Sequence, residues 1–238
     1  MASKRDGLKG KTVTLQMAKN AIKESSGGKK RLVLSNLGIK EFPKCLKKLT
    51  SEVEELDISR NYIKKLPDWI QSFKSLCWLD VHTNHIEALP SAIGQLKQLS
   101  YLNLSNNNIT EKGIPAEISQ LKNIRKLNLG LNKISVLPPS LEALTQMTEL
   151  GLFDNYLKEI PPGMLKMPKV KINLKGNPIP PAEQKEAEVE TSTRNKELYL
   201  VPREDLCSAC LSKSEKNKTK IKNLIGMCIP NSIRRRFN

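Results

Sequence analysis

An asparagine recurs along the middle of the chain at nearly constant intervals, each time in an approximate copy of the pattern L-x-x-L-x-L-x-x-N-x-I. The six asparagines are Asn61, Asn84, Asn107, Asn132, Asn155 and Asn177, separated by 23, 23, 25, 23 and 22 residues. An imperfect copy precedes them, with Leu37 in the place of the asparagine. Repetition at a period of roughly 20 to 50 residues is typical of proteins built from stacked identical units. The spacing therefore predicts a solenoid of about seven turns over residues 29–180.

Each part of the unit has a structural role. The L-x-L stretch alternates with period two, which predicts a short strand with its leucines directed inward. Strands of successive copies then stack as a parallel sheet about 4.8 Å apart. The asparagine lies at the bend after the strand, where its amide can satisfy backbone groups that the bend leaves unpaired. A following L-P pair ends the extended segment and directs the chain to the convex side, where the insertion at Thr110–Gly113 can be absorbed.

Both ends of the array need caps, because no single copy can bury its apolar face alone. Residues 14–26 predict a capping helix with Thr14 as its N-cap and Gly27-Gly28 as its stop, within an N-terminal segment of residues 1–28. Residues 181–213 predict a C-terminal cap with an edge strand near Leu198–Val201 and a short helix near Asp205–Lys213. The Lys- and Asn-rich residues 214–238 predict a basic, disordered tail.

The unit resembles that of the intracellular leucine-rich-repeat families, whose turns read L-x-x-L-x-L-x-x-N-x-L-x-x-L-P. The likeness runs over roughly residues 10–213, and is carried by Lys29–Leu32, Phe42–Cys45, Asn123–Arg125, Asn128–Asn132, Asp205–Cys207 and Ala209–Leu211. It implies an α/β leucine-rich-repeat solenoid, a horseshoe with short parallel strands on its concave face and a cap at each end. It also implies a cytoplasmic, non-catalytic protein, with male germ cells as a setting, and supplies no substrate, cofactor or defined partner.

The net charge of +16 belongs mostly to the two ends of the chain. Residues 1–31 hold nine Lys or Arg and two Asp or Glu, and residues 203–238 hold nine and three. The rest carries only +3. A strongly basic chain first suggests nucleic acid or an anionic membrane as partner, but here that reading applies to the ends and not to the repeats.

We number the unit from its first leucine, so that the recurring asparagine is at position 9. Positions 3, 5, 7 and 8 are then expected on the concave sheet, the usual binding face of a solenoid. Trp78 and Tyr101 occupy position 3 of adjacent copies, and Trp and Tyr are frequent in binding hot spots. The alternative is that the two rings pack on each other and stiffen the sheet. Leu131 and Phe153 form a second apolar pair that we expect to be exposed. The residues that we expect to contact a partner are Arg60, Trp78, Asp80, His82, Tyr101, Lys126 and Phe153.

Charge on the concave face is mildly acidic from the second to the sixth turn. Arg60 and Lys126 stand against Glu55, Asp57, Asp80, Glu149 and Asp154. This balance argues against binding of polyanions by the repeats and favours a partner with basic or mixed charge.

No set of residues adds up to catalysis or metal binding. His82 should face the concave side and His85 the outside, so they should not converge. Asp57 and Asp80, on neighbouring turns, have a spacing that a retaining glycosidase could use, but the line continues as asparagines and reads better as a solvated polar ladder. Cys207 and Cys210 share a face of the predicted C-terminal helix, and packing is favoured over a zinc or redox role because a zinc site wants four ligands. The sequence holds no G-x-G-x-x-G, P-loop or G-x-S-x-G motif.

Two classes of function remain. The first is a non-catalytic scaffold or adaptor that binds a protein on its concave face, without cofactor, metal or small-molecule substrate. The alternative is a module that binds nucleic acid or an anionic membrane through its basic tails. Five scattered cysteines, no signal peptide, no apolar run long enough to span a membrane and Ala2 in the place of a myristoylated glycine favour the cytoplasm, with the nucleus as second choice.

Overall fold

A computed structural model describes residues 12–160, 162–165, 167 and 170–180 of the 238-residue chain. Residues 1–11, the predicted C-terminal cap with its Cys207–Cys210 pair, and the basic tail of residues 214–238 lie outside these ranges. No helix within them is long and apolar enough to cross a membrane.

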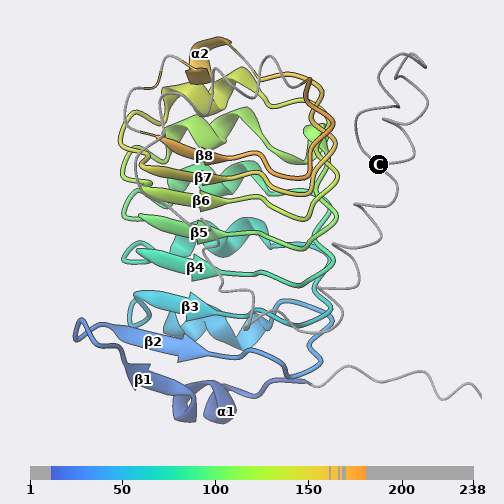
Figure 1. The fold of residues 1–238 in the computed structure, drawn as a ribbon. Coiled ribbons are helices and arrows are strands. Elements are labelled where there is room, and N and C mark those ends of the chain that lie inside the picture. The colour runs from blue at the N-terminus through green and yellow to red at the C-terminus, as the bar shows by residue number, and fades with distance from the viewer. Residues whose placement is uncertain (1–11, 161, 166, 168–169, 181–238) are drawn as a thin grey trace, which may run out of the picture.

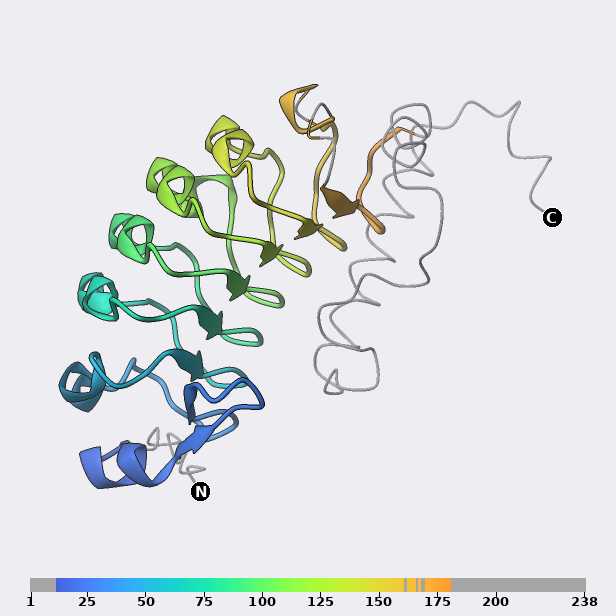
Figure 2. The same ribbon diagram turned by 90° about the vertical axis from the view of Figure 1, so that its left-hand side faces the viewer.

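The described strands form one sheet in chain order, curved into a horseshoe with the sheet on its inner side (Figures 1 and 2). From β2 onward every neighbouring pair is parallel and in the same register. The strands are β1 Ile22–Glu24, β2 Lys30–Val33, β3 Glu55–Asp57, β4 Trp78–Asp80, β5 Tyr101–Asn103, β6 Lys126–Asn128, β7 Glu149–Gly151 and β8 Lys171–Asn173. The seven strands β2 to β8 are the predicted copies, which we call repeats 1 to 7. The predicted solenoid fold is therefore confirmed.

Short helices line the convex side opposite the sheet (Figure 2). They are the 3-10 helices η1 Lys44–Leu49, η2 Asp68–Ser72, η3 Ser91–Gln95, η4 Glu111–Gly113, η5 Ala116–Gln120 and η6 Pro139–Ala143, followed by the α-helix α2 Pro162–Leu165. A proline precedes each of η1, η2, η3, η5 and η6 with an extended backbone. The helix η4 holds the insertion predicted near Thr110–Gly113.

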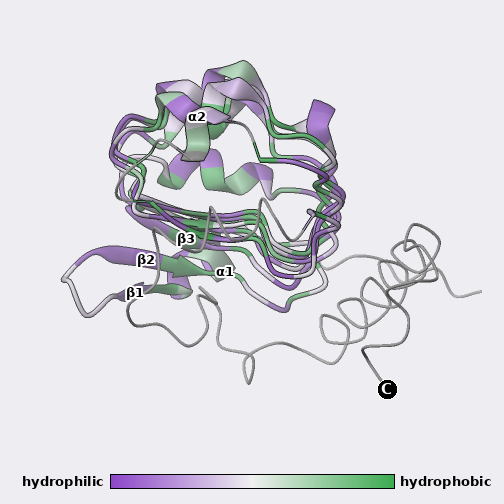
Figure 3. Ribbon diagram, turned by 45° about the horizontal axis from the view of Figure 1, so that its top comes forward, coloured by the Kyte–Doolittle hydropathy of each residue, from purple (hydrophilic) through white to green (hydrophobic). Residues whose placement is uncertain are grey.

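The core is a continuous stack of leucine and isoleucine between the sheet and these helices. In Figure 3 hydrophobic residues recur at the same place in successive repeats. Leu56, Leu79, Leu102, Leu127 and Leu150 at position 4 are all fully buried. Burial of this kind contributes about 1.5 to 3 kcal/mol per side chain, so the core holds neighbouring repeats together without help from the concave residues.

The asparagine ladder forms as predicted. Asn84 accepts the backbone N–H of Ile63 in the preceding repeat at 2.9 Å and donates to the carbonyls of Ile58 and Val81. Asn61, Asn107, Asn132, Asn155 and Asn177 make equivalent bonds. Each asparagine thus closes its own bend and ties it to the repeat before.

The predicted helix of residues 14–26 is wrong in its second half. Thr14 caps a helix as expected, accepting from the N–H of Met17, but α1 spans only Leu15–Asn20. Residues Ile22–Glu24 form β1, which pairs antiparallel with β2. The physical reason is the exposed edge of the first repeat: a hairpin strand satisfies its free backbone groups, which a helix cannot do. Gly28, at φ 71°, lies in the turn of that hairpin.

Position 8 is left-handed in every repeat. The residues are Asn36, Arg60, Thr83, Asn106, Leu131 and Asp154, with φ between 52° and 57°, and then Gly176. This conformation costs a non-glycine residue about 1 to 2 kcal/mol. Asparagine tolerates it best, whereas the β-branched Thr83 and the bulky Leu131 tolerate it least.

Candidate partner-binding face

Position 3 forms one continuous row across the concave sheet. The strand register places Arg31, Glu55, Trp78, Tyr101, Lys126, Glu149 and Lys171 opposite one another in that order. Stacked parallel strands lie about 4.8 Å apart, so each side chain can contact its neighbour in the row.

Trp78 and Tyr101 stack face to face at the centre of this row. Their ring centroids are 5.0 Å apart and the ring planes differ by 10°. The guanidinium of Arg31 lies 4.5 Å from the centroid of the Trp78 ring, and its Nε donates to Glu55 Oε2 at 2.6 Å. The rings therefore do pack on each other, as the alternative interpretation held. They also stay half-buried and outside the apolar core, so they keep surface for a partner.

Tyr101 sits in an environment that disfavours its ionised form. Burial, and next the negative charge of Asp80, raise the pKa of its phenol well above the ordinary value of about 10.

Farther along the same face, the side chains at positions 5 and 7 hydrogen-bond to one another and form a polar lattice. Ser59 donates its N–H and hydroxyl to Asp57 Oδ1, and Ser105 does the same to Asn103 Oδ1. The Nδ1 atom of His82 lies 2.6 Å from Asp80 Oδ1, which also accepts the N–H of His82. We call this part of the face, repeats 1 to 4 with the aromatic stack, the aromatic half.

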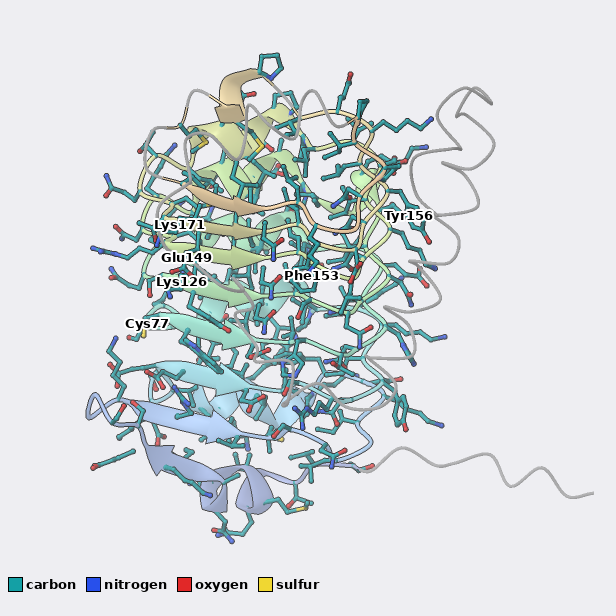
Figure 4. The ribbon with its side chains drawn as sticks, viewed as in Figure 1. Cys77, Lys126, Glu149, Phe153, Tyr156 and Lys171 are labelled. Atoms are coloured by element: carbon teal, nitrogen blue, oxygen red, sulfur yellow. The ribbon has the colours of Figure 1, made fainter. Side chains whose placement is uncertain are left out.

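Repeats 5 to 7 break the lattice, and we call them the glycine half. Asn128 accepts the N–H of Gly130 at 3.0 Å, but Gly130 has no side chain to donate, and the buried Nδ2 of Asn128 has no hydrogen-bond partner. The ring of Phe153 lies over Gly130, so close that a Cβ there would meet ring atoms at 2.3 to 2.6 Å. In Figure 4 Phe153 lies toward the carboxyl ends of the strands, away from the column of Lys126, Glu149 and Lys171.

The expectation that Leu131 and Phe153 form an exposed apolar pair is wrong. Leu131 is 1% and Phe153 4% exposed. The physical reason for Phe153 is Gly130 of the preceding repeat: because this residue has no side chain, the ring can lie directly over it. Phe153 is thus a weak candidate for partner contact.

The other predicted contact residues lie on the concave side with differing exposure. Arg60 is half-buried at left-handed position 8. Lys126 is half-buried and pairs with Glu149 at 2.9 Å. Asp80 and His82 are both buried and bonded to each other, so they offer a partner little surface.

The histidines and the paired aspartates considered for metal binding or catalysis do not form a common site. His82 is buried on the concave side, whereas His85 is exposed and its ring lies 5.7 Å from that of Tyr62. Asp57 and Asp80 are paired across β3 and β4 but each is engaged by its own position 7. Within the described ranges no three His, Cys, Asp or Glu side chains are grouped to hold a metal ion.

The concave face is closer to neutral than the sequence analysis predicted. Extending the count of positions 3, 5, 7 and 8 to the first and last repeats adds Arg31, Lys171 and Lys175 and no acid. The seven repeats then carry five basic and five acidic residues on this face. Sequence reasoning also missed Arg31 as a contact of Trp78. Arg31 could have been found from the sequence, because it occupies position 3 of the imperfect first copy.

Known proteins with similar sequences and structures have the same repeat architecture. Residues 51–109 and 98–121 match family descriptions of the leucine-rich repeat. The chain has the leucine-rich-repeat fold. A leucine-rich-repeat protein of Leptospira interrogans is 32% identical, with a TM-score of 0.59 over 62% of this chain and 37% of that one.

Two plant receptors are also similar. The ectodomain of the Arabidopsis thaliana receptor kinase GASSHO1/SCHENGEN3, solved with CASPARIAN STRIP INTEGRITY FACTOR 2, is 29% identical with a TM-score of 0.54. The plant peptide hormone receptor RGFR1, solved with RGF2, is 26% identical with a TM-score of 0.55. Each match covers 62% of this chain, and the chain spans 18% and 24% of these two receptor structures. Leucine-rich-repeat domains generally mediate protein–protein interaction and are typically non-catalytic scaffolds.

Proposed function

We propose that this chain is a non-catalytic adaptor that binds a partner protein on the aromatic half of its concave face. The observation that carries the proposal is the parallel Trp78–Tyr101 stack at the centre of the sheet. The core is complete without these rings, since leucine fills position 4 in both of their repeats. Two half-exposed aromatic rings that the fold does not need are a surface for recognition.

The stack is preorganised for binding. Arg31 lies against one face of Trp78 and is itself held by Glu55, and Tyr101 packs on the Trp78 ring. Ordering rotamer-rich side chains on binding costs about 0.5 to 1.5 kcal/mol each. Rings already held in place avoid most of that cost, so we infer that a partner docks here with little rearrangement.

The balanced charge of the face favours a partner with mixed charge. The two plant receptors above were solved with protein or peptide ligands, which supports a protein ligand for this fold in general. The chain further resembles leucine-rich-repeat-containing protein 18 in the stretches quoted from Lys29 to Leu211. On that likeness we place the adaptor in the cytoplasm of male germ cells.

Affinity capture from male germ-cell lysate tests the proposal with three forms of the full chain. These are the natural sequence, Trp78→Ala/Tyr101→Ala, and the control Gln71→Arg/Ser91→Arg, which changes exposed residues of η2 and η3 on the convex side. We expect the aromatic double variant to lose specific partners that the control retains, with both variants folded by circular dichroism. Retention of every partner by the aromatic variant would overturn the proposal.

A further inference from the structure

The helix η1 differs in charge from its counterparts in the following repeats. It reads KCLKKL and contains Lys44, Lys47 and Lys48 without an acidic residue. None of η2, η3, η5 and η6 contains a lysine, and Asp68, Glu117 and Glu142 lie within them. Since these helices occupy equivalent places on the convex side, the repeat architecture does not require the three lysines.

Neighbouring elements extend this positive charge. The helix α1 packs on η1, and the thiol of Cys45 donates to the carbonyl of Val13 just before α1. Lys19 of α1 is exposed, as are Lys44, Lys47 and Lys48. None of the four forms an ion pair with a carboxylate among the described residues. We call Lys19, Lys44, Lys47 and Lys48 the basic patch. Residues 12–50 as a whole hold nine Lys or Arg and two acids.

The chemistry of the basic patch fits a diffuse anionic surface. All four cations are lysines, which act as point charges and lack the planar fork that arginine uses for stereospecific recognition. The nearest rings offer no platform for stacking bases: Phe42 is buried, and Trp69 lies between Phe42 and Phe73 with Lys47 above it. Half-buried Leu15 and Met17 on α1 add apolar surface close to the lysines. This combination favours phospholipid head groups over nucleic acid.

We propose that the basic patch docks the protein on an anionic phospholipid surface. The patch is carried by the convex helix η1 and by α1 beside it, away from the concave strands (Figure 2). Docking there leaves Trp78 and Tyr101 open, so a lipid-bound molecule can still hold a partner. The inference does not depend on the proposed partner binding, because different residues and a different face carry it.

Sedimentation of the full chain with vesicles tests the proposal. The vesicles contain phosphatidylcholine alone or with about 30% phosphatidylserine, and a lysine near such a surface strengthens binding about fivefold. The decisive variant is Lys44→Glu/Lys47→Glu/Lys48→Glu. The matched control is Lys74→Glu/Lys97→Glu/Lys122→Glu, which changes three exposed lysines after η2, η3 and η5. Both variants have the same net charge, so the basic ends of the chain contribute equally to each.

We expect the η1 variant to lose at least about tenfold in partitioning to the phosphatidylserine vesicles, and the control less than about threefold. Because Lys47 also contacts Trp69, Lys44→Gln/Lys48→Gln serves as a milder second variant, and circular dichroism checks that each form is folded. Equal losses in the two triple variants, or equal binding to vesicles without phosphatidylserine, would show that the patch is no lipid site. Loss of duplex DNA binding by the η1 variant with vesicle binding unchanged would assign the patch to nucleic acid and overturn the proposal.

Discussion

The two halves of the concave face share one backbone and differ in what their side chains do with it. In the aromatic half, Asp57, Asp80 and Asn103 at position 5 are each bonded to position 7 of their own repeat, and Trp78 and Tyr101 stack at position 3. In the glycine half, Gly130 donates only its backbone N–H, the side-chain nitrogen of Asn128 has no hydrogen-bond partner, and the ring of Phe153 lies over Gly130. A regular solenoid can thus present one aromatic pair and bury another aromatic residue, depending on a glycine at one position.

The largest effect should be common to both halves, because both use the asparagine ladder. We expect Asn84→Ala and Asn155→Ala each to lower the free energy of unfolding by about 3 kcal/mol, since each leaves several buried backbone groups unpaired. Urea denaturation measures both. A loss below about 1 kcal/mol in either variant would mean that the ladder is not shared by the two halves as we describe.

Gly130→Ala should destabilise the glycine half by about 2 kcal/mol, because the added Cβ overlaps the ring of Phe153. The equivalent change in the aromatic half, Ser105→Ala, loses one hydroxyl bond and should cost about 1 kcal/mol. A double-mutant cycle identifies the cause: in a Phe153→Ala background, Gly130→Ala should cost less than about 0.5 kcal/mol. An undiminished cost there would show that the ring is not what fills the space.

Thr83→Asn should stabilise the aromatic half by about 1 kcal/mol, because asparagine tolerates the left-handed backbone at φ 54° that threonine resists. Thr110→Asn is the control, since Thr110 has an ordinary φ of −107°. Thermal unfolding compares the two variants. If both variants gained the same stability, the gain would come from replacing threonine by asparagine in general and not from relief of backbone strain at position 83.

The smallest effect concerns alkaline pH. The folded state holds the pKa of Tyr101 above its unfolded value of about 10, so the unfolded chain loses this proton first. Stability should therefore fall as pH rises above about 10, by up to roughly 1 kcal/mol per pH unit from this residue. Tyr101→Phe should remove that part of the decline between pH 9 and pH 11. Parallel stability curves for the two proteins would contradict the buried environment of the phenol.

The sequence predicted the fold well because the repeat supplies many copies of one signal. The spacing of the asparagines identified seven strands and their register, and the same numbering placed Trp78 beside Tyr101 and His85 on the outside. The wrong predictions concern the end of the repeat array and a side chain whose exposure depends on the neighbouring repeat. The stretch Ile22–Glu24 has helical periodicity, but the open edge of β2 draws it into a strand.

The exposure of Phe153 could not be read from its position alone. Its burial depends on Gly130 one repeat earlier, and the position of Phe153 within its own repeat does not reveal this contact. The charge of the face was misjudged for a similar reason, since the outer repeats that carry Arg31, Lys171 and Lys175 were left out of the count. Whether the face binds a partner remains a prediction.

The most direct test is the affinity of a captured partner for variants of each half. Titration calorimetry would compare Trp78→Ala/Tyr101→Ala with Phe153→Ala, each checked for folding by urea denaturation. Hot-spot residues are worth about 2 kcal/mol or more each, so we expect the aromatic variant to weaken binding at least about a hundredfold and Phe153→Ala less than about threefold. A partner that tolerates loss of Trp78 and Tyr101 but not of Phe153 would place recognition in the glycine half and contradict the account.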